Sequence, residues 1–336
     1  MALISLGDMA HSFMLRRQTA DLKQSAQQAS AEVVSGLSFD PAARQHGDLV
    51  PIAAIETSLT RLEGYRAVTN DTATMAGAMQ TVLQTIEHQT DDLVPALLNL
   101  GLTEGLGTLN RLTTEVRQGL DGVISALNTR LGDRSLFAGI AADQPALANA
   151  DTILTALDAA ISASGAVTIG EIDAAVTTWF ADPAGFSSVG YLGGEPLSPL
   201  YLSPEDQVQG MLTAAHPALR DTLKGMALVA LADRAAGASG AGIRMALARR
   251  GGETLLQNRS DRAALAADLG MAEARIEAAA TRNQAEKSAL ELARNGLLVV
   301  DPFEAATRME ATQSQLEALY AVTARLSRLN LVDFLR

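Results

Sequence analysis

The side chains best suited to chemistry are scattered along this chain. Four histidines, His11, His46, His88 and His216, occur singly, and none stands at the spacing of a metal-binding pair. The sequence contains no cysteine, which excludes disulfides and thiolate chemistry. It also contains no strand–turn–helix nucleophile motif and no lysine-bearing phosphate loop. We therefore expect no catalytic residue, no bound metal and no cofactor.

Two stretches keep other chemistry open. Residues 237–242 are Gly-rich and precede a predicted helix, whose N-terminus can bind phosphate, but they have no lysine beside them and fit a flexible hinge better. Trp179, Tyr191 and Tyr201 are available to line an enzyme pocket, or equally a small core. We keep an enzyme with its site in this middle part of the chain as an alternative.

Five arginines form a local basic cluster in the C-terminal half: Arg244, Arg249, Arg250, Arg259 and Arg262. One interpretation is that they pair with carboxylates of the same chain. The other is that they contact a neighbouring subunit.

The strongest element is a helix predicted over residues 301–336. Asp301 at the N-cap, Pro302 at the first helical position and Glu304 three residues after the cap form a strong start. About 34 residues at 1.5 Å each give a rod of roughly 50 Å. Its apolar residues recur in steps of three, four or seven: Met309, Leu316, Leu319, Val322, Leu326, Leu329, Val332 and Leu335.

A second amphipathic helix is predicted over residues 5–35, ending at Gly36. Its heptad seam is rich in alanine, so a leucine-rich helix can lie close to it. We expect the two chain ends to pair, either within one monomer or as elements of an assembly. The predicted assembly interface consists of Leu15, Leu22, Ala26, Ala29, Val33, Leu316, Leu319, Val322, Leu326, Leu329 and Leu335.

Between the ends, the pattern predicts further helices and two short strands. The helices are expected at residues 51–100 with a kink or stop at Pro95, 108–131 with a stop at Gly132, near 153–157 and 169–176, at 217–234, and at 243–294 with a stop at Asn295-Gly296. The strands are expected at residues 200–202 and 208–212, on either side of a turn.

These elements predict a mainly α fold, with a long antiparallel coiled-coil stalk formed by both chain ends and a small inserted α+β domain. We predict three domains. Residues 1–40 with 301–336 form the terminal coiled coil, residues 41–140 with 241–300 form a helical rod, and residues 141–240 form the insertion.

Composition narrows the function classes further. Hydrophobic residues make up 48 % of the chain but aromatic residues only 4 %, which suits helix-on-helix packing. The net charge of −12 argues against nucleic-acid binding. No apolar stretch approaches the roughly 20 residues needed to span a bilayer, and no cleavable signal peptide is visible. We expect a protein that is either cytosolic or exported without a cleaved signal.

Three stretches resemble the flagellin superfamily. Residues 301–310, DPFEAATRME, continuing through Leu329, are similar to its terminal helix, and Val34-Ser35-Gly36-Leu37 with Asp40-Pro41 resembles its shortened N-terminal junction. Residues 132–139, GDRSLFAG, are similar to the "G-RYLFAG" motif of the hook–filament junction branch, although Ser135 replaces the tyrosine. The resemblance covers the two ends, about two thirds of the chain, and not residues 141–240.

The resemblance implies a non-enzymatic, self-assembling adaptor that joins hook to filament. It implies that the paired ends form an inner tube and that the chain leaves the cell through the flagellar type III export channel. The implied partners are further copies in a ring, a neighbouring hook-associated protein, flagellin, and an export chaperone in the cytosol. Filament flagellin itself is the first alternative, and a cytosolic coiled-coil adaptor is the second.

Overall fold

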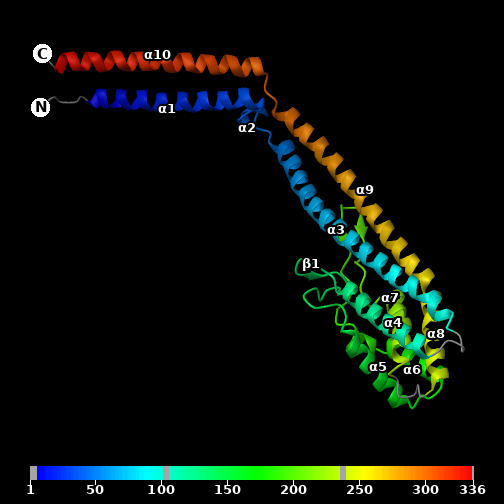
Figure 1. The fold of residues 1–336 in the computed structure, drawn as a ribbon. Coiled ribbons are helices and arrows are strands. Elements are labelled where there is room, and N and C mark those ends of the chain that lie inside the picture. The colour runs from blue at the N-terminus through cyan, green and yellow to red at the C-terminus, as the bar shows by residue number, and fades with distance from the viewer. Residues whose placement is uncertain (1–5, 101–105, 235–239, 335–336) are drawn as a thin grey trace. The chain divides into compact units, whose positions relative to one another are not determined.

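The computed structural model describes residues 6–100, 106–234 and 240–334. Helices dominate these residues, which confirms the mainly α fold (Figure 1). The helices are α1 (Leu6–Ser35), α2 (Pro41–Arg44), α3 (Val50–Leu98), α4 (Leu106–Leu127), α5 (Ala150–Ser164), α6 (Ile169–Ala181), α7 (Pro217–Leu231), α8 (Ala241–Gln257), α9 (Arg259–Leu298) and α10 (Pro302–Phe334), with a π-helical turn, η1, at Phe186–Gly190.

The chain divides into two units, and α3 and α9 contribute to both. Unit 1 comprises residues 1–63 and 285–336, and unit 2 comprises residues 64–284. This division differs from the three predicted domains, because residues 141–240 share one hydrophobic core with α3, α4, α8 and α9 rather than forming a core of their own.

In unit 1, α1 and α10 lie side by side and antiparallel (Figure 1). The first part of α3 pairs with the last part of α9. Lys287 Nζ lies 3.3 Å from Glu63 Oε1, and Arg294 Nη1 lies 3.2 Å from Glu56 Oε1. The predicted pairing of the chain ends is therefore present within a single chain.

Unit 2 is organised around α7, whose side chains are buried over almost its whole length. Helices α4 and α8 pack against it. Two glycines let α7 and α8 approach closely, because a Cβ on Gly251 would lie 2.5 Å from the carbonyl oxygen of Gly225. Strong burial of leucine and alanine, with few aromatic rings, matches the composition of the chain.

Two small antiparallel strand pairs complete unit 2. Strands β3 (Leu200–Tyr201) and β4 (Gln207–Val208) flank the predicted turn. The first lies where a strand was predicted, but the strand predicted over residues 208–212 is wrong beyond Val208, because residues 209–212 are not in a strand. Strands β1 (Arg130–Leu131) and β2 (Arg134–Ser135) were not predicted. Gly132, expected to stop a helix, instead adopts φ +61° in the turn between β1 and β2, and α4 already ends at Leu127. A glycine in the left-handed conformation occurs both at helix ends and in hairpin turns, and Gly132 lies in a hairpin turn.

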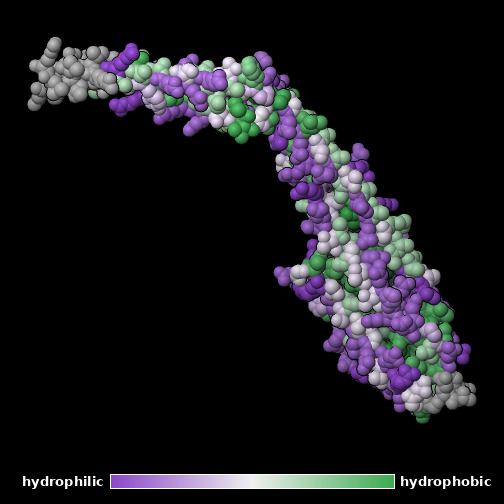
Figure 2. Space-filling model, turned by 45° about the horizontal axis from the view of Figure 1, so that its top comes forward, coloured by the Kyte–Doolittle hydropathy of each residue, from purple (hydrophilic) through white to green (hydrophobic). Residues whose placement is uncertain are grey.

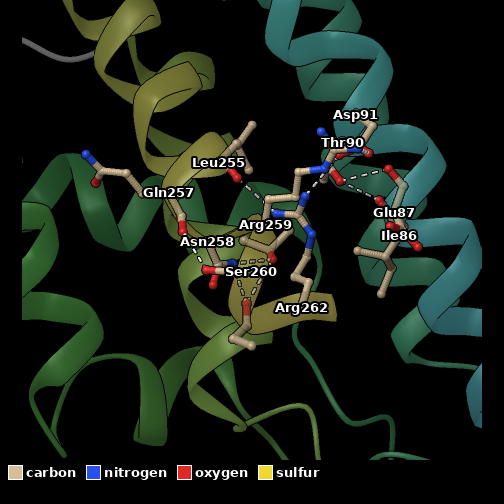
Figure 3. A network of polar contacts seen from close by, with 12 residues as sticks. Ile86, Glu87, Thr90, Asp91, Leu255, Gln257, Asn258, Arg259, Ser260 and Arg262 are labelled. Carbon is tan, nitrogen blue, oxygen red and sulfur yellow. Dashed lines mark hydrogen bonds and ion pairs between the residues drawn. The ribbon is translucent and has the colours of Figure 1, made fainter. Parts of the chain in front are cut away.

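The helix predicted over residues 243–294 is two helices, α8 and α9, separated at Asn258 (Figure 3). The Asn258 side-chain amide donates to the carbonyl oxygen of Ala218 at 2.7 Å and to Thr222 Oγ1 at 2.9 Å, both on α7. The break therefore depends on a tertiary contact rather than on Gly or Pro. At the far end, α9 runs through Asn295-Gly296, where a stop was expected, to Leu298.

Arg262 on α9 stabilises this break from the other side (Figure 3). Its side chain is only 7 % exposed. It donates to the Leu255 carbonyl oxygen at 3.1 Å, near the end of α8, and to Asp91 Oδ1 on α3 at 3.2 Å. Arg259 pairs with the other Asp91 oxygen at 3.0 Å. Burial lowers the pKa of Arg262, while the Asp91 carboxylate opposes that shift.

Pro95 lies inside α3, which continues to Leu98. The ring has no N–H, so the Asp91 backbone carbonyl has no i+4 donor. Pro95 was predicted to end or kink the helix. The helix ends three residues after Pro95, at Leu98, so only the predicted end is confirmed, and it lies within one turn of the proline.

Replacement of Asp91 by alanine should destabilise unit 2, because Arg262 would remain buried without its carboxylate. We expect the free energy of unfolding to fall by about 2–3 kcal/mol. The loss is smaller than for a fully buried pair, because the Asp91 side chain is partly exposed to solvent. Unfolding in urea measures this change in the free energy of unfolding. Glu115→Ala, which removes the exposed Arg111–Glu115 pair, should change stability by no more than about 0.5 kcal/mol. Equal effects for the two variants would contradict the assigned role of Arg262.

Candidate assembly interface

The predicted seam of α1 faces α10. Along α1, Ala29 is buried and the other four predicted residues are partly buried: Leu15, Leu22, Ala26 and Val33. On α10, Leu319 is buried and Leu316 partly buried. The structure thus brings seven of the predicted interface residues to the α1–α10 contact. Lys23 adds a cation–π contact across the pair, with Nζ 5.9 Å from the centre of the Tyr320 ring.

Val322 lies off this seam and is 48 % exposed. Along α10 the inward positions are Ala305, Met309, Thr312, Leu316 and Leu319, in alternating steps of four and three. The next such step falls at residue 323, so Val322 points aside. Leu326 and Leu329 belong to α10, but their side chains, like Leu335 as a whole, lie outside the described residues.

The two connectors at the base of the pair are hydrogen-bonded to each other. Val300 N donates to the Gly36 carbonyl oxygen at 2.9 Å, and Ser38 N donates to the Leu298 carbonyl oxygen at 2.8 Å, forming an isolated antiparallel bridge between Leu37 and Val299. Gly36 has φ +69°, the left-handed conformation that commonly ends a helix. This bridge fixes where α1 ends relative to where α10 begins.

Glu32 holds the same base together. Its carboxylate is nearly buried and accepts from Phe39 N at 2.9 Å, and it lies 3.4 Å from Arg308 Nη2 on α10. One carboxylate therefore links α1, the connector and α10. Sequence reasoning missed Glu32 and Arg308. The sequence did contain one signal for Glu32: its carboxylate stands directly beside Val33, at the end of an otherwise apolar seam.

Large apolar side chains remain exposed around this base and along α1: Phe13, Met14, Val34, Phe39, Val299 and Phe303. Phe303 is 81 % exposed although it is the second residue of α10. Figure 2 shows hydrophobic side chains interspersed with polar ones on the molecular surface. A pair of helices has only one seam and cannot cover these residues itself.

The aromatic residues considered for a pocket make the following contacts. Trp179 packs edge-on against Phe180, with ring centroids 5.1 Å apart, and the Tyr191 hydroxyl donates to the Gly194 carbonyl oxygen at 2.7 Å. Tyr201 is exposed on β3. Within the described residues, no group of three or more His, Cys, Asp or Glu side chains is placed to bind a metal ion.

The basic cluster is paired within the chain. Arg244 pairs with Asp233, Arg249 and Arg250 with Glu253, Arg250 also with Asp173, and Arg259 and Arg262 with Asp91. Of the Gly-rich stretch, residues 237–239 lie outside the described residues and Gly240 is the N-cap of α8. Among the described helices, none is long and apolar enough to span a membrane.

Comparison with known proteins finds similarity in sequence and in fold. The family model of the bacterial flagellin C-terminal helical region matches residues 257–335, which include the whole of α9 and α10. A solved structure of a flagellar hook-associated protein from Vibrio parahaemolyticus is similar in fold, with a TM-score of 0.54 and 13 % sequence identity, over 77 % of this chain and 98 % of that one. No curated protein matches the chain.

Over residues 257–335 the chain matches the C-terminal helical region of bacterial flagellin, and the greater part of the chain shares the mainly helical fold of the Vibrio structure. The resemblance to the flagellin superfamily, drawn from the residues at both chain ends, is confirmed by sequence over residues 257–335, and the solved structure shows a similar fold alone.

Replacement of Glu32 by alanine should loosen the base of the α1–α10 pair, because the Phe39 N–H and Arg308 both lose their acceptor. The local cost is about 1–3 kcal/mol. We expect faster amide exchange at Ser38 and Phe39, measured by NMR or mass spectrometry.

Two further variants serve as controls for this measurement. Glu32→Gln keeps an acceptor oxygen and should lose less protection than Glu32→Ala. Glu310→Ala, which removes an exposed carboxylate on α10, should leave the exchange unchanged. If Glu32→Ala also exchanges like the unmodified chain, Glu32 does not hold the base.

Proposed function

We propose that this protein is a self-assembling structural adaptor of the bacterial flagellum that joins hook to filament. The observation that carries the proposal is the exposed apolar surface of unit 1, at the base of the α1–α10 pair, whose α10 lies within the region that matches the flagellin C-terminal model. Exposed apolar patches of this kind mark association surfaces. Burial of that surface contributes about 25 cal/mol per Å².

In this proposal the α1–α10 pairs of many copies form an inner tube. Residues 41–140 with 241–300 form the next shell, and residues 141–240 face outward. The proposed interface comprises the seam residues together with Val322, Leu326, Leu329 and Leu335, of which Val322 is exposed in the single chain. The chain passes through the flagellar type III channel without a cleaved signal, held beforehand by an export chaperone. Its partners are further copies in a ring, a neighbouring hook-associated protein and flagellin.

Filament flagellin is the second candidate, since the matched C-terminal region carries that family's description. Two observations favour the junction role. Residues 132–139 are similar to the junction-branch motif, and the solved structure of similar fold is described as a hook-associated protein. A cytosolic coiled-coil adaptor is the remaining alternative, and it predicts absence from sheared flagella.

Deletion of the gene should leave hooks in place but without attached filaments, with flagellin shed into the medium. Negative-stain electron microscopy of cells, together with an assay of flagellin in the culture supernatant, distinguishes the candidates. Loss of flagellin from both cells and medium would favour the filament role. The protein's absence from sheared wild-type flagella would reject both flagellar roles.

The double substitution Phe39→Ser with Phe303→Ser should weaken assembly without unfolding the monomer, because both side chains are exposed. We expect at least a tenfold loss of filament attachment in the complemented deletion strain, about 1.4 kcal/mol per copy. Val167→Ser, which changes an exposed apolar residue of unit 2, is the matched control. Equal attachment in the double variant and the control would remove the assigned role of this surface.

The isolated monomer should have weakly protected ends, because a two-helix pair buries too little apolar surface to hold itself rigidly. Hydrogen exchange of soluble monomer should show α1 and α10 exchanging at least a hundredfold faster than α7, and assembly should slow both. Protection of α1 and α10 equal to that of α7 would contradict assembly-dependent ordering.

A further inference from the structure

A groove of about 480 Å³ lies in unit 2, between the extended segment at residues 208–212 and α9. Its floor is apolar, formed by residues such as Val208, Met211, Leu265 and Leu269. His216 lines it at the end where α7 begins. The assembly role proposed above does not involve this groove.

His216 is the N-cap of α7. Its ring nitrogen Nδ1 accepts a hydrogen bond from Ala218 N at 3.3 Å, in the place where Ser, Thr, Asp or Asn is usual. A ring nitrogen accepts only when it carries no proton, so this cap requires neutral imidazole. Protonation converts the acceptor into a donor that faces the Ala218 N–H.

Asp268 of α9 lines the same groove, and its negative charge attracts a proton to His216. The other charged side chain lining the groove is Arg275, also from α9, and residues 208–212 contribute none. On α7 the first charged residue is Arg220, one turn further along.

The two influences on the ring oppose each other. Burial lowers the pKa of His216 below its ordinary value of 6.5 and is the larger effect, whereas Asp268 raises the pKa. The folded state therefore binds a proton less readily than the unfolded chain. Stability contributed by neutral His216 is complete above about pH 6.5 and is lost as the pH falls through that value toward the folded pKa.

We propose that His216 is a two-position proton switch at the start of α7. The neutral ring caps the helix, and the protonated ring turns into the groove and pairs with Asp268. This movement releases the first turn of α7 and occupies the end of the groove. Because α7 is the helix around which unit 2 packs, the switch connects external pH to the most buried element of that unit.

The experiment measures amide exchange at residues 218–220 between pH 5 and pH 7.5, normalised to intrinsic rates. The unmodified chain should lose protection about fivefold as the pH falls through the NMR-detected midpoint of His216 protonation, the equilibrium shift expected when an N-cap is lost. His216→Asn retains a capping oxygen that does not titrate, so its protection should not change with pH. An equal pH response in His216→Asn would overturn the proposal.

Asp268→Asn tests the second position. Without the carboxylate, the NMR-detected midpoint of His216 protonation should move to lower pH, and the loss of protection should move with it. An unchanged midpoint would show that the ring does not pair with Asp268. In the unmodified chain, a His216 midpoint above 6.5 would also overturn the switch, and this measurement needs no variant that must fold.

Discussion

The contact between α1 and α10 is the constraint on which the other features of unit 1 depend. Two antiparallel helices share a single seam, so each can hide only one stripe of its surface. Among the described side chains of unit 1, the buried apolar residues are few: Ala29, Leu59, Leu62, Val300, Ala305 and Leu319. Unit 2, by comparison, has a continuous core that runs from Ala76 to Ala279. Unit 2 therefore buries its apolar residues within its own core, whereas unit 1 leaves the side chains of Phe39 and Phe303 exposed to solvent.

Where apolar burial is scarce, polar contacts fix the geometry. Glu32 joins three segments, the Leu37–Val299 bridge aligns the connectors, and the side-chain amide of Gln45 donates to the Leu297 carbonyl oxygen at 2.6 Å. Hydrogen bonds are directional, so they set register even where they add little net stability. The base of the helix pair is therefore defined geometrically while much of its apolar surface remains available to other copies.

Local patterns were enough to predict most elements but not their tertiary interruptions. The Asp301-Pro302 start and the spacing of apolar residues predicted α10, and the seam residues of α1 were placed correctly against it. Asn258 was not recognised as a helix break because its partners, Ala218 and Thr222, lie about 40 residues away in sequence. Gly132 and Gly296 were both interpreted as helix stops. A glycine permits a stop without requiring one, and neighbouring strands or packing decide the outcome.

Apolar spacing predicts part of the seam between α1 and α10 within one chain, and contact of the same residues with other copies stays a prediction. Apolar spacing identifies which residues need cover, but a seam of alternating three- and four-residue steps assigns Leu319 inward and Val322 outward, which a list of apolar residues does not distinguish. A search for apolar periodicity does not find the polar residues of the α1–α10 contact, such as Glu32 and Arg308. The positions of Leu319 and Val322 on the helix therefore decide which of them is buried. Leu319 packs within the α1–α10 pair, whereas Val322 is 48 % exposed, as Phe39 and Phe303 also are exposed.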